Sequence, residues 1–267
     1  MKIAVCVKQV PDSWAEKKMA DGLLDRASVD AVLNDLDEYA IEEALRIVEA
    51  NTPEGAEVSD HTITLISMGP ERATDALRKG LSMGADSAIH ISDAALSGSD
   101  ALATSLVLSQ AITKGGYDLV ICGTESTDAR MSVIPAMLAE RLHWAQLTFA
   151  GSVTVDPIAG AVSIARVTEE GVEKLTAQLP AIVSVVEKIN EPRYPSFKGI
   201  MAAKKKTINL LALADVGVSA SDVGLASAWS QVKDAALRPP RGAGIKVEDA
   251  GNGGTELVTF LAEKRLV

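Results

Sequence analysis

The segment from residue 123 to residue 135 has the residue types of a phosphate-binding loop. It follows an apolar run, residues 119–122, and leads into a helical pattern. Gly123 lets the backbone turn and approach a ligand, and the unpaired N–H groups at the start of the next helix attract a phosphate. In an open α/β sheet a nucleotide binds outside the carboxyl ends of the strands. The residues are equally consistent with an ordinary loop that Asp128 or Ser132 caps.

A second polar loop, residues 34–37, precedes an acidic helical pattern near the end of the first predicted strand. We expect its backbone to meet the base or ribose of a nucleotide whose phosphate lies at the Asp128 loop. Another interpretation explains the same acids, with Asp37 as the N-cap of the helix and Glu42 and Glu43 on its solvated face. No pair of carboxylates is spaced for general acid–base catalysis.

A third segment, residues 190–206, places apolar side chains among prolines and lysines. Phe197, Ile200 and Met201 on such a projection are typical of anchors for a partner protein, and the neighbouring lysines would orient an acidic surface. The alternative is a short helix that buries Ile200 and Met201 on its own domain.

Several kinds of chemistry lack support. No G-x-G-x-x-G opens a first helix and no Walker loop occurs, which argues against nucleoside triphosphate hydrolysis. The histidines at positions 61, 90 and 143 lack zinc-ligand spacing, and we expect no metal. Cys6 and Cys122 each lie in an apolar run, which favours buried, reduced thiols.

The elements that must position these segments alternate between strand and helix. Apolar runs at 3–7, 63–68, 87–91 and 119–122 alternate with helical patterns at 37–50, 71–83, 101–113 and 131–142. This alternation predicts an α/β fold with a mainly parallel, Rossmann-like sheet and flanking helices. Residues 147–186 carry strand patterns around a turn near Asp156, which predicts an antiparallel extension.

The composition agrees with that fold class. Hydrophobic residues make up 47% of the 267 residues but aromatic residues only 3%, so the core must consist of aliphatic side chains. The formal net charge of -10 argues against general nucleic-acid binding. No run of eighteen apolar residues or signal-peptide pattern appears, so we expect a cytoplasmic protein that does not insert into a membrane.

The segments described above, in this order, resemble the beta subunits of electron-transfer flavoproteins. The resemblance begins with Val-Cys-Val-Lys-Gln-Val-Pro-Asp at residues 5–12 and continues through the loops at Asn34 and Asp128. It is strongest in Asn-Glu-Pro-Arg-Tyr at 190–194 and Ile-Met-Ala-Ala-Lys-Lys-Lys at 200–206.

The resemblance implies a heterodimer in which an alpha subunit holds most of the FAD and this subunit buries AMP. It implies an adenine-nucleotide alpha-hydrolase-like domain over residues 1–206, with a recognition loop at 188–206, and a C-terminal arm at 207–267 that wraps the alpha subunit. The implied AMP-binding positions are Cys6, Asn34, Asp35, Leu36, Asp37, Met68, Asp128, Ala129, Arg130, Met131, Ser132, Val133 and Ile134. The phosphate would lie on N–H groups near Ser132 and Val133.

The resemblance also implies an electron carrier without catalytic residues of its own. The recognition loop would dock acyl-CoA or related dehydrogenases through Tyr194, Phe197, Ile200 and Met201, with Phe197 at the anchor position. Electrons would pass through the FAD to a quinone oxidoreductase and the respiratory chain, as in fatty acid beta-oxidation.

Other functions remain open from the sequence. Bifurcating members of the family bind a second FAD through a loop that carries Thr and Gln, whereas bulky Arg130 and Met131 occupy the loop here, which favours AMP. A nucleotide-binding sensor of the universal-stress type would explain the first half of the chain but not residues 190–206. A pure interaction scaffold with an empty pocket is the third alternative.

Overall fold

The computed structural model describes residues 1–20, 22–56, 59–236 and 238–267. The chain divides into two compact units, Met1–Lys233 and Asp234–Val267. The first unit contains the sheet and both candidate sites. In the second unit, the helix α7 (Gly253–Glu263) is the one regular element among the described residues.

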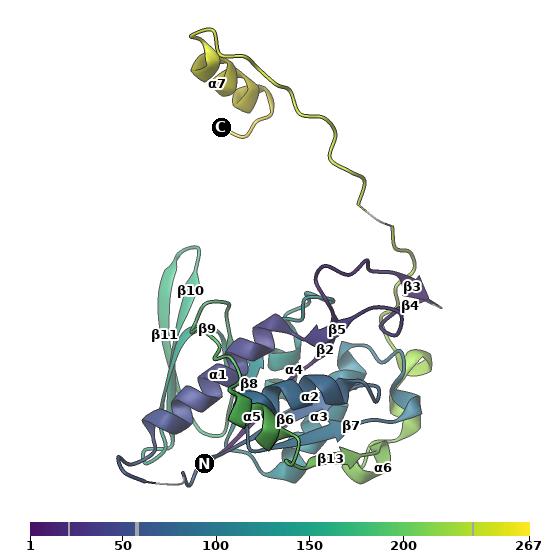
Figure 1. Cartoon of the computed structure of the whole chain (residues 1–267), viewed down its shortest axis with the longest axis vertical. Coiled ribbons are helices and arrows are strands. Elements are labelled where there is room, and N and C mark those ends of the chain that lie inside the picture. Colours follow the sequence, from purple (N-terminus) through teal and green to yellow (C-terminus); the bar gives the residue numbers. More distant parts are fainter. Residues whose placement is uncertain (21, 57–58, 237) are drawn as a thin grey trace. The chain divides into compact units, whose positions relative to one another are not determined.

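The first unit is built on one large sheet (Figure 1). Among the described residues it has nine strands, in the order β11-β10-β9-β12-β8-β1-β6-β7-β13. Its parallel part consists of β1 (Lys2–Cys6), β6 (Thr62–Met68), β7 (Ser87–Ile91), β8 (Leu119–Gly123), β12 (Ala181–Val185) and β13 (Ile208–Leu211). The strands β9 (Ala145–Asp156), β10 (Ala161–Thr168) and β11 (Gly171–Gln178) form the antiparallel extension. The predicted fold class is therefore confirmed.

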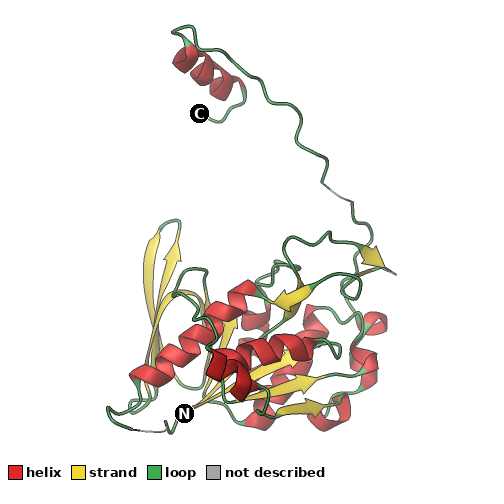
Figure 2. Ribbon diagram, in the orientation of Figure 1, coloured by secondary structure: helices red, strands yellow, loops and turns green. Residues whose placement is uncertain are grey.

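Helices cover both faces of the parallel part (Figure 2). The helices α1 (Asp35–Ala50) and α2 (Ala73–Met83) pack with Ile3 and Val5 of β1 in one apolar core. The helices α3 (Ala101–Gly115) and α4 (Ile134–Leu142) pack with Ala4 in a second core. The two cores lie on opposite faces because successive side chains of a strand point to opposite sides.

Local sequence signals set several helix ends. Gly84 ends α2 with a φ of 144°, a conformation that residues with a side chain rarely adopt. Asp100 caps α3 by accepting a hydrogen bond from the N–H of Ala103. Pro135 lies in the first turn of α4, where its missing N–H has no cost.

Short elements complete the structure. Small pairs of strands form between β2 (Gln9–Pro11) and β5 (Ala31–Leu33), and between β3 (Met19–Ala20) and β4 (Leu23–Leu24). The remaining helices are η1 (Ala94–Leu96), α5 (Phe197–Ala203), α6 (Leu213–Val216), η2 (Ala220–Asp222) and η3 (Leu225–Ser227). None of the helices in the described parts of the chain is long and apolar enough to cross a membrane.

Some predicted boundaries differ from the structure. The acidic helix begins at Asp35 rather than 37, and α4 begins at Ile134 rather than 131. The predicted arm began at 207, but β13 pairs with β7 and the first compact unit extends to Lys233. Because β13 is short and half exposed, its sequence carries little sign that it belongs to the sheet.

Candidate functional site

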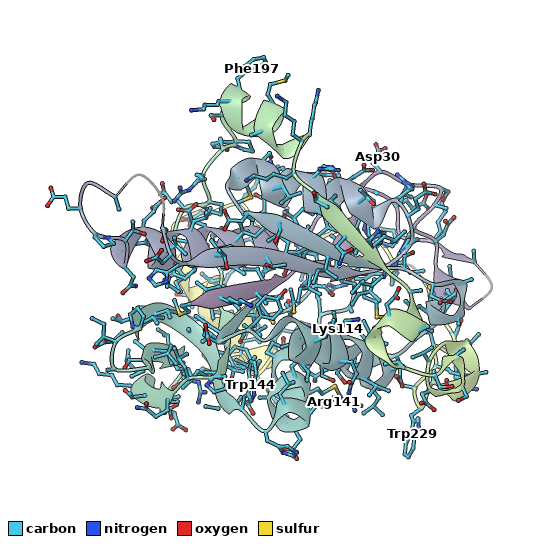
Figure 3. The ribbon with its side chains drawn as sticks, turned by 90° about the horizontal axis from the view of Figure 1, so that it is seen from below. Asp30, Lys114, Arg141, Trp144, Phe197 and Trp229 are labelled. Atoms are coloured by element: carbon cyan, nitrogen blue, oxygen red, sulfur yellow. The ribbon has the colours of Figure 1, made fainter. Side chains whose placement is uncertain are left out.

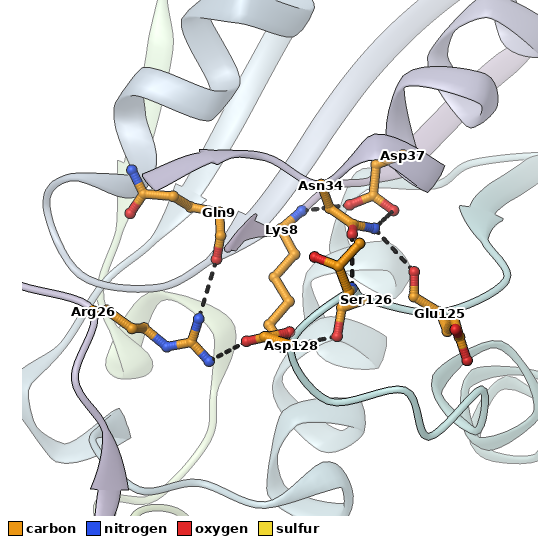
Figure 4. Close-up of polar contacts among 9 residues, drawn as sticks. Lys8, Gln9, Arg26, Asn34, Asp37, Glu125, Ser126 and Asp128 are labelled. Atoms are coloured by element: carbon orange, nitrogen blue, oxygen red, sulfur yellow. Dashed lines mark hydrogen bonds and ion pairs between the residues drawn. The ribbon is translucent and has the colours of Figure 1, made fainter. Parts of the chain in front are cut away.

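Asn34 connects the start of α1 with the loop that follows β8 (Figure 4). Its buried side-chain amide donates to the Oδ1 of Asp37 over 2.9 Å and to the carbonyl of Glu125 over 3.0 Å. Its Oδ1 accepts from the N–H of Thr127, also at 3.0 Å. Asn34 is the N-cap residue of α1, yet its side chain makes no capping bond because it reaches across to the loop. It therefore fixes the path of the loop backbone.

Asp37 lies inside this network. It is buried, and its Oδ2 accepts from the N–H of Lys8 at 2.7 Å. Burial raises the pKa of Asp37 to about 7, against the effect of hydrogen bonds from Asn34 and Lys8. Gly123 is required beside it, because an added Cβ would lie 2.6 Å from the Oδ1 of Asp37. The interpretation of Asp37 as the N-cap is wrong, since Asn34 holds that position.

Asp128 holds the far side of the same loop. Its buried carboxylate pairs with the Nζ of Lys8 at 2.9 Å and with Nη2 of Arg26 at 2.5 Å. Burial alone would raise the pKa of Asp128, but the Lys8 ammonium and then Arg26 outweigh it and bring the pKa to about 2. Lys8 also donates to the hydroxyl of Ser126. The Asp128 side chain therefore positions the loop and is turned away from any ligand on its outer surface.

The stretch between Asp128 and α4 lies on the surface, where its backbone is open to a ligand. Ala129, Arg130 and Met131 are exposed, and both Arg130 and Ser132 have a left-handed backbone, with φ of 50° and 54°. Ser132 donates to the carboxylate of Glu125. No described side chain caps α4, whose N-cap residue is Val133. The first N–H groups of α4 thus have no side-chain partner, which is the requirement for binding an anion there.

The parallel strands place other predicted residues at the same edge. Cys6 ends β1 opposite Cys122 of β8, and Met68 ends β6. Since these strands are parallel, their carboxyl ends and the loops that follow them lie together. Both cysteines are free thiols, and Cys6 is half-buried. The structure therefore brings together the predicted nucleotide-binding positions from four separate segments of the chain.

A cavity of about 530 Å³ adjoins this site. Asp35 and Leu36 at the start of α1 line one part of it, and Arg130 of the loop lines another. Arg193 and Tyr194, from the segment before α5, also line it. The nucleotide loop and the third predicted segment are thus neighbours in space.

The third segment projects apolar side chains from α5. Tyr194 and Phe197 are 94% and 81% exposed, and Ile200 and Met201 are 43% and 44% exposed. Phe197 lies at the outer end of α5, away from the sheet (Figure 3). The alternative in which Ile200 and Met201 are buried on their own domain is wrong.

Sequence reasoning missed the residues that hold the loop and the segment in place. Lys8 follows the first strand directly, so its position near the site had a detectable signal, but Arg26 had none because it lies in an irregular loop. Glu42 and Glu43 are buried rather than solvated. They contact Arg193 and Asn190, about 150 residues away in the chain, which no local pattern reveals.

Comparison with known proteins defines the class. A family model described as the electron transfer flavoprotein domain matches residues 21–216. An electron transfer flavoprotein subunit beta from Mycobacterium leprae is 48% identical over 99% of both chains. The subunit beta from Megasphaera elsdenii is 37% identical over 93% of both chains. A subunit of the caffeyl-CoA reductase-Etf complex of Acetobacterium woodii is 34% identical over the full length of both.

These relatives identify the subunit as well as the class. The chain belongs to the beta subunits of the electron transfer flavoproteins, and it is an electron carrier subunit.

Proposed function

We propose that this subunit binds AMP and joins an alpha subunit that holds most of an FAD, in a heterodimer of the non-bifurcating type. The observation that carries the AMP site is the loop from Asp128 to Val133. Its side chains at Asp128 and Ser132 turn inward to protein partners, while its backbone is exposed and leads into a helix without a side-chain cap. Such a loop offers N–H groups to a phosphate.

The polar network limits how AMP is held. Asn34, Asp37 and Asp128 have their side chains engaged within the chain. The phosphate therefore lies on the N–H groups of Ser132 and Val133. The base and ribose meet the backbone of residues 34–37 and the strand ends at Cys6 and Met68. Because the network fixes the loop before the ligand arrives, little ordering is required on binding.

AMP rather than a second FAD is favoured by the loop itself. Arg130 and Met131 are bulky and exposed in this loop. A second flavin needs room for a pyrophosphate and a further ring system at this loop. This loop carries bulky Arg130 and Met131 and lacks the Thr and Gln through which bifurcating members bind a second FAD, so AMP is favoured.

The exposed side chains of α5 form the docking surface for electron donors. Phe197, Ile200 and Met201 present an apolar patch, and Lys198 and Lys204 beside it are exposed and positively charged. An acyl-CoA or related dehydrogenase with an apolar pocket and acidic rim fits this chemistry. The donor's electrons would then go on to a quinone oxidoreductase and the respiratory chain. The FAD supplies the redox chemistry, and this chain supplies binding and orientation.

The C-terminal unit is the arm that contacts the alpha subunit. Its helix α7 exposes Leu257, Val258 and Phe260, and no described residue of α7 is buried. Large exposed apolar side chains on a helix indicate a protein contact. We therefore assign this contact to residues 234–267 rather than to the whole of 207–267.

The experiment is to co-express this chain with its alpha subunit, purify the complex, record the visible spectrum and identify the released nucleotides. One FAD and one AMP per heterodimer support the proposal. Two FADs indicate the bifurcating type. A chain that binds nucleotide but forms no flavin-containing complex supports the universal-stress-type sensor, and a complex without AMP contradicts the AMP site.

A further inference from the structure

The helix α5 is too short and too exposed to hold its own position. It has seven residues, and only Ala203 at its end is buried, at 3% exposure. Isolated helices shorter than about 12 residues are marginal in water, and most helical stability in proteins comes from packing an apolar face. The apolar side chains of α5 point outward, so its position must be set by other contacts.

Arg193 holds the chain just before α5. Its side chain donates to both oxygens of Glu42, over 2.7 and 2.9 Å, and to both oxygens of Glu49, over 2.6 and 3.1 Å. Both glutamates belong to α1, seven residues apart, on the same face of the helix. The N–H of Arg193 also donates to Glu42. Only an arginine can bind two carboxylates in this planar, bidentate manner.

Arg78 holds the chain just after α5. Its Nη1 donates to the carbonyls of Ala203 and Lys206, both at 2.6 Å. Lys206 in turn donates to the carbonyl of Ala85, just beyond the end of α2, at 2.5 Å. Each of these cations lies at the C-terminal end of the neighbouring helix, where the helix dipole favours positive charge.

Between these two ends, α5 packs against α2, and Ala203 at its end joins the apolar core that includes Leu81 and Met83. Gly199 approaches so closely that an added Cβ would lie 2.6 Å from the carbonyl oxygen of Ser82. Beside this contact a cavity of about 390 Å³ opens, lined by Met83, Arg193, Lys198 and Lys206 among others. The polar contacts at the two ends of α5 therefore add to this packing in defining its orientation.

We propose that Arg193 and Arg78 are positioning residues that keep α5 ordered before a donor dehydrogenase arrives. This inference rests on the proposed docking function of α5. The donor then meets a preformed surface at Phe197, Ile200 and Met201, and the cost of ordering a seven-residue segment does not reduce its affinity. Neither arginine needs to touch the donor.

The test uses the complete heterodimer with the alpha subunit. One variant is Arg78→Met. The other combines Arg193→Met with Glu42→Gln, because Arg193→Met alone would leave the buried carboxylate of Glu42 without its main partner. The control is Lys114→Met, which removes a contact of the same kind, from Lys114 to the carbonyl of Asp215 at 2.6 Å, elsewhere in the unit.

Two readouts separate positioning from general stability. The first is steady-state kinetics with an acyl-CoA dehydrogenase that reduces the wild-type heterodimer. The heterodimer is the varied substrate, and its KM and the kcat are measured. The second is hydrogen exchange of the backbone amides of residues 197–203 without the dehydrogenase. We expect faster exchange in both variants and a KM about tenfold higher at unchanged kcat, the change that about 1.4 kcal/mol of added ordering cost produces. Lys114→Met should leave both readouts unchanged.

Phe197→Ala distinguishes failure of this inference from failure of the docking function. If Phe197→Ala raises the KM but the arginine variants leave both KM and exchange unchanged, the positioning role is wrong. If Phe197→Ala leaves the KM unchanged, the docking function itself is wrong. Arg78→Lys should have a KM close to that of the wild type, because the lysine ammonium can still reach the two carbonyls. A KM that rises only in proportion to a loss of folded protein would also overturn the inference.

Discussion

The nucleotide loop and α5 use their side chains in opposite ways. At the nucleotide loop (residues 123–133), the side chain of Asp128 and those of Asn34 and Asp37 at the start of α1 turn inward to protein partners and leave the loop backbone on the surface. In α5, Arg78 donates to the backbone carbonyl of Ala203, and the large apolar side chains point outward. A small phosphate can be bound by backbone N–H groups, whereas a protein partner requires large apolar anchors.

This difference has a consequence for stability. The loop network is buried and joins segments far apart in the sequence, so breaking it should weaken the whole first unit. The outward face of α5 contributes little to the fold, so changing it should affect docking alone. The predictions below test this contrast, from the largest expected effect on stability to the smallest.

The largest effect is expected from Asn34→Ala. It leaves the N–H of Thr127 and the carbonyl of Glu125 without their partner, and it removes a donor to Asp37. Unsatisfied buried groups cost about 1–3 kcal/mol each, so we expect a loss of roughly 3 kcal/mol in the free energy of unfolding. Urea unfolding of the heterodimer measures the change in the free energy of unfolding. We also expect the purified variant to contain less AMP, which analysis of the released nucleotide measures.

The matched control is Asp35→Asn, one residue further on at the exposed start of α1. It removes only a favourable interaction with the helix dipole, which contributes about 0.3–1 kcal/mol. Equal losses from Asn34→Ala and Asp35→Asn would mean that the network does not stabilise the loop.

Acid should affect the loop through Asp128. Its pKa in the folded state, about 2, lies below the ordinary value of 3.8. The stability it contributes is therefore fully present above about pH 4 and is lost as the pH falls from about 4 to 2. Over this pH range we expect the free energy of unfolding of the wild type to fall by about 2 kcal/mol more than that of Asp128→Asn. Unfolding curves for both proteins from pH 5 to pH 2 measure the difference, and parallel curves would contradict the ion pairs.

A smaller gain is expected from relieving the left-handed backbone of the loop. Arg130→Gly should stabilise the protein by about 0.5–1 kcal/mol, because a left-handed conformation strains residues that carry a Cβ. Met131→Gly is the control, since Met131 is not among the residues with a positive φ and glycine there only adds freedom to the unfolded chain. A stabilising effect of Met131→Gly equal to that of Arg130→Gly would refute this explanation. Thermal unfolding of both variants gives the comparison.

Sequence and structure agree where a local pattern carries the information. The apolar runs located the central strands, and the loops that follow β1 and β8 were correctly placed at one edge because parallel strands share their direction. The apolar residues of α5 were identified by their unusual setting among prolines and lysines.

The contacts that hold these sites could not be predicted. Arg193 reaches Glu42 across 151 positions of sequence, and Arg26 reaches Asp128 across 102. Such pairs depend on how the elements pack, and a glutamate that will be buried looks the same in sequence as one on a solvated helix face. For the same reason the sequence suggested Asp37 as a cap, although the fold places it in a buried network.

The separation of the two sites is tested most directly by Phe197→Ala in the purified heterodimer, with the KM for reduction by an acyl-CoA dehydrogenase measured on protein of known AMP content. We expect the KM to rise about tenfold or more, since loss of a central anchor costs about 2 kcal/mol or more of binding energy. The AMP content and the thermal unfolding temperature should remain those of the wild type. An unchanged KM, or a loss of AMP and stability together with docking, would contradict the account.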